Sequence, residues 1–198
     1  MAASDLTIEQ GKTFNKVLRW ETGPIIYKPI TGITQAAPAR ITAADHNLPN
    51  GWRAAVVSVK GMTQINAQST PPKTSDYHKV TVIDANTVEL NDVNAADYKA
   101  YQSGGYLQFN TPVDMTGMTA RMAIKDKVGG TVLLSLTTAN SRIVLDNASK
   151  TVRLVIPAAD TAGITWKKGV FDLELISVDG TVTKLLSGAV AVVQEVTT

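Results

Sequence analysis

The sequence predicts an all-β protein in which an antiparallel β-sandwich is interrupted by an inserted small β module. Residues 119–198 form a series of short segments with alternating apolar and polar side chains, separated by turn signals. Leu, Ile, Val and Thr are abundant, whereas aromatic residues make up only 6%, a composition typical of pleated sheets. Between residues 40 and 106 the composition shifts toward Asn, Asp and Ala, which indicates a separate module.

The first expected element is a β-hairpin over residues 5–20. Leu6 and Ile8 alternate with polar residues, Gly11 follows in a turn signal, and the alternation resumes from Phe14. We therefore expect the two halves of this segment to pair with each other.

Residues 21–39 are expected to form an edge strand and a connector. Pro24, Pro29 and Pro38 separate short apolar pieces such as residues 25–27. Proline cannot donate a hydrogen bond to a sheet ladder, so these pieces suit the edge of a sheet.

The module at residues 40–106 contains both histidines, four of the five tyrosines and Trp52. Pro71-Pro72 marks a loop, and residues 94–101 predict one helical turn that Gly104-Gly105 would stop. The expected strands are residues 40–42, 54–60, 78–83 and 87–90, with a tight turn at residues 84–86.

After Gln108 the alternation of apolar and polar residues returns. Asp179-Gly180 is a strong hairpin signal, and Pro157 is expected to start one short helix within residues 157–163. The expected strands are residues 120–125, 131–137, 143–145, 151–156, 170–176 and 181–196.

The strand at residues 170–176 has the clearest two-residue period. Phe171, Leu173 and Leu175 fall on one face and are expected to point inward, while Asp172 and Glu174 point outward. A solvated outer face explains this pair of carboxylates better than acid–base catalysis does.

These elements predict two domains. Residues 1–39 and 107–198 form the sandwich, and residues 40–106 form the inserted module. An insertion between strands is tolerated when its ends lie close together at the surface.

Composition excludes several functional classes. The chain has no cysteine, which excludes disulfides, thiolate zinc sites and thiol nucleophiles. A net charge of +2 gives no field that would recruit nucleic acid or a membrane. The first residues show no secretory signal pattern, so we expect synthesis and assembly in the cytoplasm.

Catalysis has little support in the sequence. His46 lies in a polar loop, where it is expected to bond its own backbone, and His78 begins a strand. Gly104-Gly105 and Gly129-Gly130 match neither a dinucleotide fingerprint nor a P-loop and are interpreted as turns. We expect no enzymatic activity, no cofactor and no metal.

The remaining aromatic and basic residues favour packing and solubility. Trp20, Trp52 and Trp166 lie far apart without interleaved basic residues, so core or interface packing is the preferred interpretation. Arg121, Lys125 and Lys127 form a mild basic stripe that Asp126 interrupts.

Two thirds of the chain resembles small tailed-bacteriophage structural proteins, in particular the amino-terminal sandwich domain of baseplate upper proteins, which attach fibres or spikes to a tail. The segments that carry the resemblance are LTIEQG at 6–11, VDMTG at 113–117, ARMAIK at 120–125, IPAADTAG at 156–163, GVFDLEL at 169–175, GTVTKLLSG at 180–188 and EVT at 195–197.

The inserted module resembles a small β-barrel, the first catalytic cysteine half-domain of ubiquitin-activating enzymes. Phage proteins carry such barrels without that chemistry, and the absence of cysteine excludes thioester transfer here. The segments that carry this likeness are ITAADHNLPNG at 41–51, VSVKG at 57–61, IN at 65–66, VTVID at 80–84, TVEL at 87–90 and SGG at 103–105.

The resemblance implies a virion protein of a tail or baseplate, an adaptor that connects the tail to fibres or spikes. Its expected partners are other virion proteins and further copies of itself, because many copies make modest contacts sufficient. One alternative is a head-to-tail connector or capsid-decorating protein. A second, from another class, is a module that binds host glycans.

The candidate interaction surface has two parts. Edge strands offer exposed ladders to a neighbouring strand, and Ile25, Tyr27, Val190 and Val192 mark the two expected edges. Glycan binding would instead use exposed aromatic side chains, for which the candidates are Trp52, Tyr77, Tyr98 and Tyr101.

Overall fold

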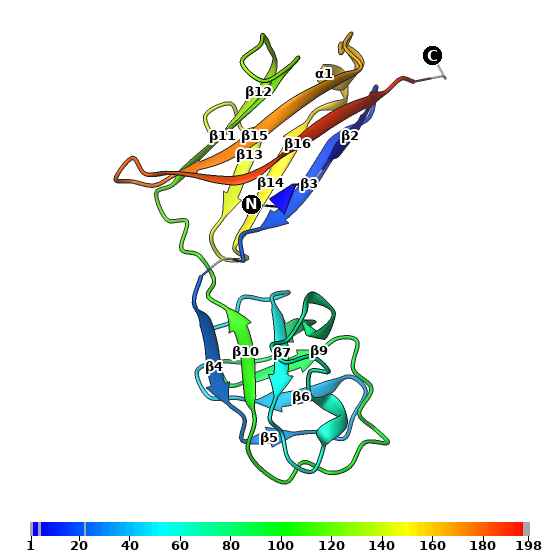
Figure 1. Ribbon diagram of the computed structural model, residues 1–198, viewed down its shortest axis with the longest axis vertical. Helices are drawn as coiled ribbons and strands as arrows, with labels where there is room; N and C mark the ends of the chain where they lie inside the picture. The colour runs from blue at the N-terminus through cyan, green and yellow to red at the C-terminus, as the bar shows by residue number, and fades with distance from the viewer. Residues whose placement is uncertain (1, 4, 22, 196–198) are drawn as a thin grey trace. The chain divides into compact units, whose positions relative to one another are not determined.

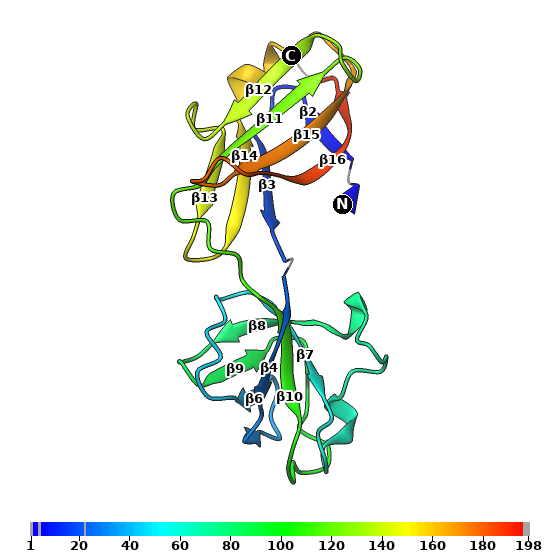
Figure 2. The ribbon, with the colours of Figure 1, turned by 60° about the vertical axis from the view of Figure 1, so that its left-hand side comes forward.

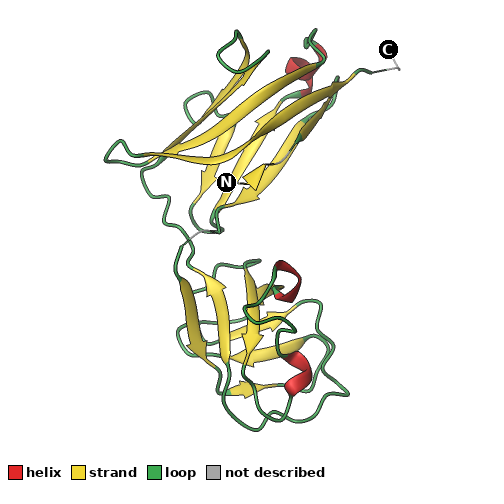
Figure 3. Cartoon of the chain, viewed as in Figure 1, coloured by secondary structure: helices red, strands yellow, loops and turns green. Residues whose placement is uncertain are grey.

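The computed structural model describes residues 2–3, 5–21 and 23–195 and confirms the all-β prediction (Figure 3). The chain divides into two compact units. The first, named the sandwich unit, comprises Met1–Trp20 and Asp114–Thr198, and the second, named the inserted unit, comprises Glu21–Val113.

The sandwich unit contains two facing sheets (Figures 1 and 2). The smaller sheet has the order β13 (Ile143–Asp146), β14 (Thr151–Ile156), β3 (Phe14–Arg19). The larger sheet has the order β1 (Ala2–Ala3), β16 (Val182–Val193), β15 (Lys168–Ile176), β11 (Thr119–Lys125), β12 (Val132–Thr137), and β2 (Leu6–Glu9) also pairs with β16. β1 and β2 run parallel to β16, whereas the other strand pairs of this unit are antiparallel.

The core of the sandwich unit lies between the two sheets. Phe171, Leu173 and Leu175 are all buried, and Asp172 and Glu174 on the alternate positions point outward, as predicted. Each strand contributes alternate apolar residues to the core because successive side chains of a strand point to opposite faces. The other buried members include Leu6, Ile8, Met122, Ile124, Leu136, Ile143, Val152, Leu154, Ile156, Leu186 and Val190.

The predicted hairpin over residues 5–20 is wrong. β2 pairs with β16 in the larger sheet, whereas β3 pairs with β14 in the smaller sheet. The turn between them carries the chain from one sheet to the other, and Gly11 adopts a φ of 77° there. The alternation of apolar residues is the same for both arrangements, so it does not distinguish a hairpin from two strands that face each other across a core.

The short helix predicted after Pro157 is confirmed as α1 (Ala158–Ala162). The buried Thr161 hydroxyl of this helix donates to the carbonyl oxygen of Lys12 (2.8 Å), and the Gln10 side chain donates to the carbonyl oxygen of Ile164 (3.0 Å). These bonds fasten the helix to the turn between β2 and β3.

The inserted unit has one seven-stranded antiparallel sheet that curves into a half-barrel (Figure 1). Its order is β4 (Ile25–Pro29), β10 (Tyr106–Asn110), β7 (Arg53–Val57), β8 (His78–Val82), β9 (Thr87–Leu90), β6 (Ala39–Thr42), β5 (Gly32–Ile33). The ends of the sheet approach each other at residues 30 and 31. Ile30 N–H donates to the carbonyl oxygen of Gly105 beside β10, and Thr31 N–H donates to that of Thr42 on β6.

The half-barrel encloses a core of its own. Trp52 is its largest side chain and is fully buried. The other buried members are Ile30, Ala39, Ile41, Ala43, Leu48, Ala54, Val56, Val59, Met62, Ile65, Val80, Val88, Leu90, Val93, Ala95, Leu107 and Phe109.

The boundaries of the inserted unit differ from the predicted 40–106. Residues 21–39 and 107–113, which the sequence assigned to the sandwich, belong to the inserted unit. β4 pairs with β10 along its whole length, and β5 pairs with β6. The change of composition at residue 40 therefore falls inside a sheet, because backbone pairing joins strands of different composition.

The helical turn predicted at residues 94–101 is also wrong. This segment is an irregular turn in which Ala96 N–H donates to the Asn94 side chain and Tyr98 N–H donates to the carbonyl oxygen of Ala95. The helical turns of this unit in the described residues are two 3-10 turns elsewhere, Thr63–Ile65 and Thr74–Asp76. Asn94 competes with helix formation by bonding the backbone two residues ahead.

Hydrogen bonds join the entry and exit of the inserted unit. Thr111 N–H donates to the carbonyl oxygen of Pro24 (3.2 Å), and the Asn110 side chain donates to that of Glu21 (3.2 Å). Arg53 donates hydrogen bonds to the Glu21 carboxylate from Nε (3.0 Å) and Nη2 (2.5 Å). The chain therefore enters and leaves this unit at neighbouring points.

Candidate interaction surfaces

β4 is an edge strand, as the sequence predicted. Among the described residues it pairs with β10 alone. The carbonyl of Pro24 and the N–H of Ile30 bond toward the β10 side. Successive residues of an antiparallel strand direct their peptide groups to opposite sides, so residues 26 and 28 face β10 and the peptide groups of Ile25 and Tyr27 face the free edge.

The outer face of β4 and β10 carries an exposed apolar patch. Ile25, Tyr27 and Tyr106 are 44%, 52% and 44% exposed, respectively. The rings of Tyr27 and Tyr106 meet edge to face, with centroids 6.1 Å apart and an interplanar angle of 89°. This patch, named the tyrosine patch and formed by Ile25, Tyr27 and Tyr106, is held in place on two hydrogen-bonded strands.

Tyr106 was missed by the sequence analysis. It alternates with Leu107 and Phe109, and those two side chains are buried in the core. The two-residue period of a strand therefore places Tyr106 on the outer face. Residue 106 fell at the predicted end of a domain, which hid this alternation.

Tyr77 covers the sheet next to the tyrosine patch. Its hydroxyl accepts a hydrogen bond from the side chain of Gln108 (2.8 Å). Gln108 is only 2% exposed. The loop before Tyr77 is held by the Asp76 carboxylate, which accepts from the N–H groups of Lys73 (2.8 Å) and Gln68 (3.1 Å). The bond from Lys73 is the main cause that lowers the pKa of Asp76. Tyr77 therefore serves the fold of the unit.

Trp52 cannot be part of an interaction surface. Its side chain is fully buried, and its indole Nε1–H donates to the carbonyl oxygen of Asn110 (3.0 Å). Trp52 immediately precedes β7, and its ring fills the half-barrel. This overturns the expectation of an exposed Trp52 that stacks on a sugar and agrees with the packing interpretation of the tryptophans.

Tyr98 and Tyr101 are partly buried and pack against the core of the inserted unit. The Tyr101 hydroxyl donates to the carbonyl oxygen of Ile30 (2.8 Å). The Gln35 side chain donates to the carbonyl oxygen of Tyr98 (2.6 Å). With Trp52 buried, the four aromatic residues expected to bind glycans do not form one exposed platform.

The second expected edge, at Val190 and Val192, is also wrong. Both side chains are buried, and β16 lies between β15 and β2. Val190 pairs with Leu6, and Val192 with Ile8. The amino-terminal strand therefore occupies the side of β16 that was expected to be free.

β12 forms one edge of the larger sandwich sheet, and a side chain caps the carboxyl end of this strand. Thr138 N–H bonds to Ala120, so the peptide groups of Ser135 and Thr137 face away from β11. Asn140 folds back onto these groups. Its Nδ2 donates to the carbonyl oxygen of Ser135 (3.1 Å), and its Oδ1 accepts from Thr137 N–H (2.9 Å).

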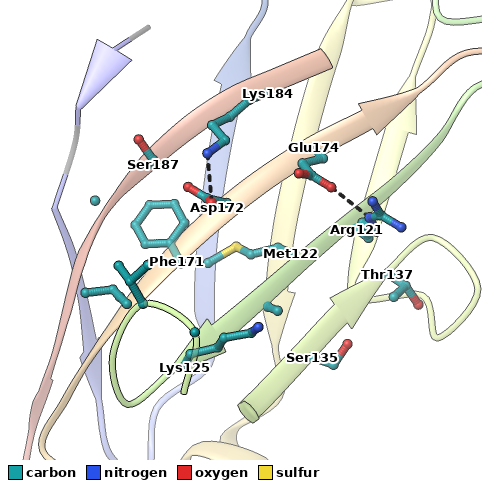
Figure 4. A pocket seen from close by; sticks show the side chains of 15 residues that line it. Arg121, Met122, Lys125, Ser135, Thr137, Phe171, Asp172, Glu174, Lys184 and Ser187 are labelled. Carbon is teal, nitrogen blue, oxygen red and sulfur yellow. Dashed lines mark hydrogen bonds and ion pairs between the residues drawn. The ribbon is translucent and has the colours of Figure 1, made fainter. Parts of the chain in front are cut away.

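A groove of about 680 Å³ lies on the outer face of the larger sandwich sheet (Figure 4). Two ion pairs cross it, Arg121–Glu174 (2.7 Å) and Lys184–Asp172 (2.8 Å). Lys125 also lines the groove, and its side chain makes no hydrogen bond or ion pair with a described residue. The outward carboxylates of β15 thus neutralise neighbouring cations, as expected for a solvated face.

The two histidines both lie in the inserted unit. His46 is buried; its Nδ1 accepts from Leu48 N–H (3.0 Å), and its Nε2 donates to the carbonyl oxygen of Asp84 (3.0 Å). The predicted role of His46 in bonding its own loop is confirmed. His78 Nδ1 lies 2.9 Å from the Asp92 carboxylate.

Among the residues that the structure describes, the titratable groups form no cluster that suits a metal. No group of three His, Cys, Asp or Glu residues in the described part of the chain could hold an ion. The largest pKa effect that we find is at Asp114, where bonds from the Thr116 hydroxyl and the Asn147 amide lower the pKa to about 2. Asn147 also accepts from Met115 N–H (2.9 Å), so this cluster locks two loops of the sandwich unit together.

No protein-family model matches the sequence, and no curated protein matches it. The structure defines a broad class, an all-β chain with a sandwich and an inserted half-barrel. None of the helices that the structure describes has the length and apolar character needed to span a bilayer.

Proposed function

We propose that this chain is a structural protein of a tailed bacteriophage, an adaptor in the tail or baseplate that connects the tail to fibres or spikes. The observation that carries the proposal is the free edge of β4 with the exposed tyrosine patch beside it. A regular strand edge with apolar side chains offers a neighbour both backbone hydrogen bonds and buried area. The resemblance of the sequence to baseplate sandwich domains supplies the biological setting.

An adaptor has to hold more than one partner, and the two units offer separate surfaces. The inserted unit presents β4 and the tyrosine patch, while the sandwich unit presents the groove between β12 and β16. Each surface stands on a unit with its own core. In this proposal the sandwich unit docks in a ring, the inserted unit contacts a neighbour or the fibre, and many copies make modest contacts sufficient.

A head-to-tail connector or a capsid-decorating protein would use the same surfaces at another place in the particle. The glycan-binding alternative is weakened because Trp52 is buried and Tyr77 and Tyr101 use their hydroxyls within the fold. The exposed aromatic pair is Tyr27 with Tyr106, which lies beside a strand edge and thus suits a protein neighbour.

The test is to locate the chain in intact particles assembled from the genome that encodes it. Antibody against the full chain, visualised with gold particles in electron micrographs, should label the tail tip or baseplate. Label at the neck or over the head would replace the adaptor by the connector or the decorating protein. Particles that carry no label and no peptides of this chain by mass spectrometry would overturn the proposal.

A further inference from the structure

We propose that β4 pairs antiparallel with β4 of a second copy of this chain, in a register centred on Ile26. The outward peptide groups of β4 belong to the residues that this pairing requires. Ile25 and Tyr27 direct their peptide groups outward, and two such edges related by a two-fold axis face each other with the same groups. This inference rests on the strand edge alone and does not depend on the proposed function.

Two prolines set the length of the pairing. Pro24 and Pro29 flank the edge, and Pro29 has no N–H to offer. The usable donors of β4 are therefore those of Ile25 and Tyr27. Prolines at the ends shorten the ladder but leave its middle open, whereas Asn140 bonds the outward peptide groups of Ser135 and Thr137 at the carboxyl end of β12.

The register centred on Ile26 uses these donors in two complete pairs. Ile25 and the partner's Tyr27 exchange both backbone hydrogen bonds, and Tyr27 and the partner's Ile25 do the same. A register centred on Tyr27 would use the same donors, but it would place Ile25 opposite the partner's Pro29, where only one of the two bonds forms. Both registers make four backbone hydrogen bonds, so side chains decide between them.

Side chains favour the register centred on Ile26. Ile25 lies opposite the partner's Tyr27 on the outer face, and the pair occurs twice. Aromatic residues opposite β-branched residues are among the most stabilising cross-strand pairs, at about 0.2–1 kcal/mol relative to two alanines. Lys28 is the one charged residue of β4, and it falls opposite the partner's Pro24, so no like charges face each other.

The occupant is a second copy because the edge is complementary to itself in hydrogen bonds, in side-chain pairs and in charge. The strand is short, and the area it can bury is below the roughly 1,200–2,000 Å² of a standard stable interface. The isolated dimer is therefore weak, with a Kd on the order of 10 μM to 1 mM, and is strengthened where many copies are held together.

Disulfide trapping tests the register, because the natural chain has no cysteine. In the proposed register residue 26 meets its own copy at a non-hydrogen-bonded position, with Cα atoms about 4.5 Å apart, inside the roughly 4.4–6.8 Å that a disulfide spans. The full-length variant Ile26→Cys should form a covalent dimer about ten times faster than the control Val132→Cys on β12, an edge residue that is 51% exposed and therefore more accessible than the partly buried Ile26.

Equal rates for Ile26→Cys and Val132→Cys would overturn the pairing. A faster reaction of Tyr27→Cys than of Ile26→Cys would overturn the register, since that residue meets its own copy only in the alternative centred on Tyr27. Circular dichroism checks that each variant folds.

Sedimentation equilibrium of the cysteine-free chain gives an independent measurement, which also covers the case in which Ile26→Cys does not fold. The average mass should rise with concentration. Tyr27→Lys should abolish the rise, whereas Val132→Lys on the capped β12 edge should leave it unchanged. A mass that stays at the monomer value up to about 1 mM, or a rise that Tyr27→Lys does not affect, contradicts the dimer.

Discussion

The sandwich unit and the inserted unit use different contacts to fix their backbones. In the sandwich unit long ladders dominate, and β15 pairs with both β11 and β16 along most of its length. In the inserted unit the strands have two to five residues, and side chains such as His46, Asn66 and Asp76 bond the backbone of long loops. A periodic sequence thus suffices for the first unit, while individual polar residues decide the second.

The units also differ at their sheet edges. In the sandwich unit Asn140 caps β12, whereas in the inserted unit no described residue caps the edge of β4. Natural sheets usually protect their edges, so an uncapped edge with exposed tyrosines points to use by a neighbour. In the sandwich unit, Asn140 therefore hinders the addition of a strand at β12. In the inserted unit, the edge of β4 can accept a further strand.

The largest expected effect tests whether the core of the inserted unit is its own. Trp52→Ala removes the biggest buried side chain and should lower the free energy of unfolding by about 3–5 kcal/mol. Hydrogen exchange measured by mass spectrometry should show lost protection within residues 23–113 and little change in the sandwich unit. The matched control Trp166→Ala, at a half-buried position of the sandwich unit, should have a smaller effect. Equal loss of protection in both units would contradict the view that the inserted unit has a core of its own.

The converse change is Leu173→Ala in the sandwich unit. This side chain is fully buried between the sheets, and its truncation should destabilise by about 2–5 kcal/mol. Exchange should rise in residues 5–20 and 114–195 and stay low in the half-barrel. Val178→Ala, at an 80% exposed position, should change stability by less than about 0.5 kcal/mol. A large effect of Leu173→Ala on the half-barrel would show that the cores are coupled.

A smaller effect is expected from His46→Ala, which tests the role of polar side chains in the inserted unit. The substitution leaves the N–H of Leu48 and the carbonyl of Asp84 without their partner. Unsatisfied buried groups cost about 1–3 kcal/mol, which denaturant unfolding can measure. His78→Ala removes only the pair with the exposed Asp92 and should cost less than about 1 kcal/mol. Equal losses of unfolding free energy in the two variants would show that the bonds of His46 do not stabilise the loop.

The smallest effect concerns a cluster of side chains around Asp114 in the sandwich unit, which holds two loops as polar side chains do in the inserted unit. The folded protein lowers the pKa of Asp114 to about 2, so its carboxylate stabilises the fold above the ordinary pKa of an aspartate. This contribution should fade as the pH falls from about 4 to about 2.

Asp114→Asn should therefore be less stable than the natural chain at pH 7 and differ little from it near pH 2. Thermal unfolding at several pH values measures this difference, with Asp97→Asn, an exposed position, as the control. A difference that does not change with pH would assign the effect to geometry instead of charge.

The sequence predicted the strands of the sandwich unit well because their signals are local. The alternation of Phe171, Leu173 and Leu175 and the Asp179-Gly180 turn required no knowledge of neighbours. The partner of β2 could not be derived, because Leu6 and Ile8 alternate identically in a hairpin and in a strand that pairs with β16. The unit boundary was missed for a similar reason, since pairing of β4 with β10 leaves no trace in composition.

In the candidate interaction surfaces too, features with a local signal were predicted and features that depend on strand pairing were not. Pro24 and Pro29 correctly indicated an edge strand at Ile25 and Tyr27. Val190 and Val192 were misjudged because an edge is a property of the whole sheet, and the parallel strand that covers them lies at the other end of the chain. Trp52 was placed among the exposed aromatics because a single tryptophan at a strand start carries no period that would reveal its burial.

The neighbouring entry and exit of the half-barrel have an evolutionary consequence. β4 and β10 begin and end side by side, with Ile25 opposite Asn110, about 5 Å apart. A span this short can be bridged by a tight turn, so recombination can delete residues 26–109 or exchange them for another fold whose ends lie equally close, while β3 and β11 keep their places. The segment is in this sense a cassette, and a lineage can vary it without rebuilding the domain that carries it.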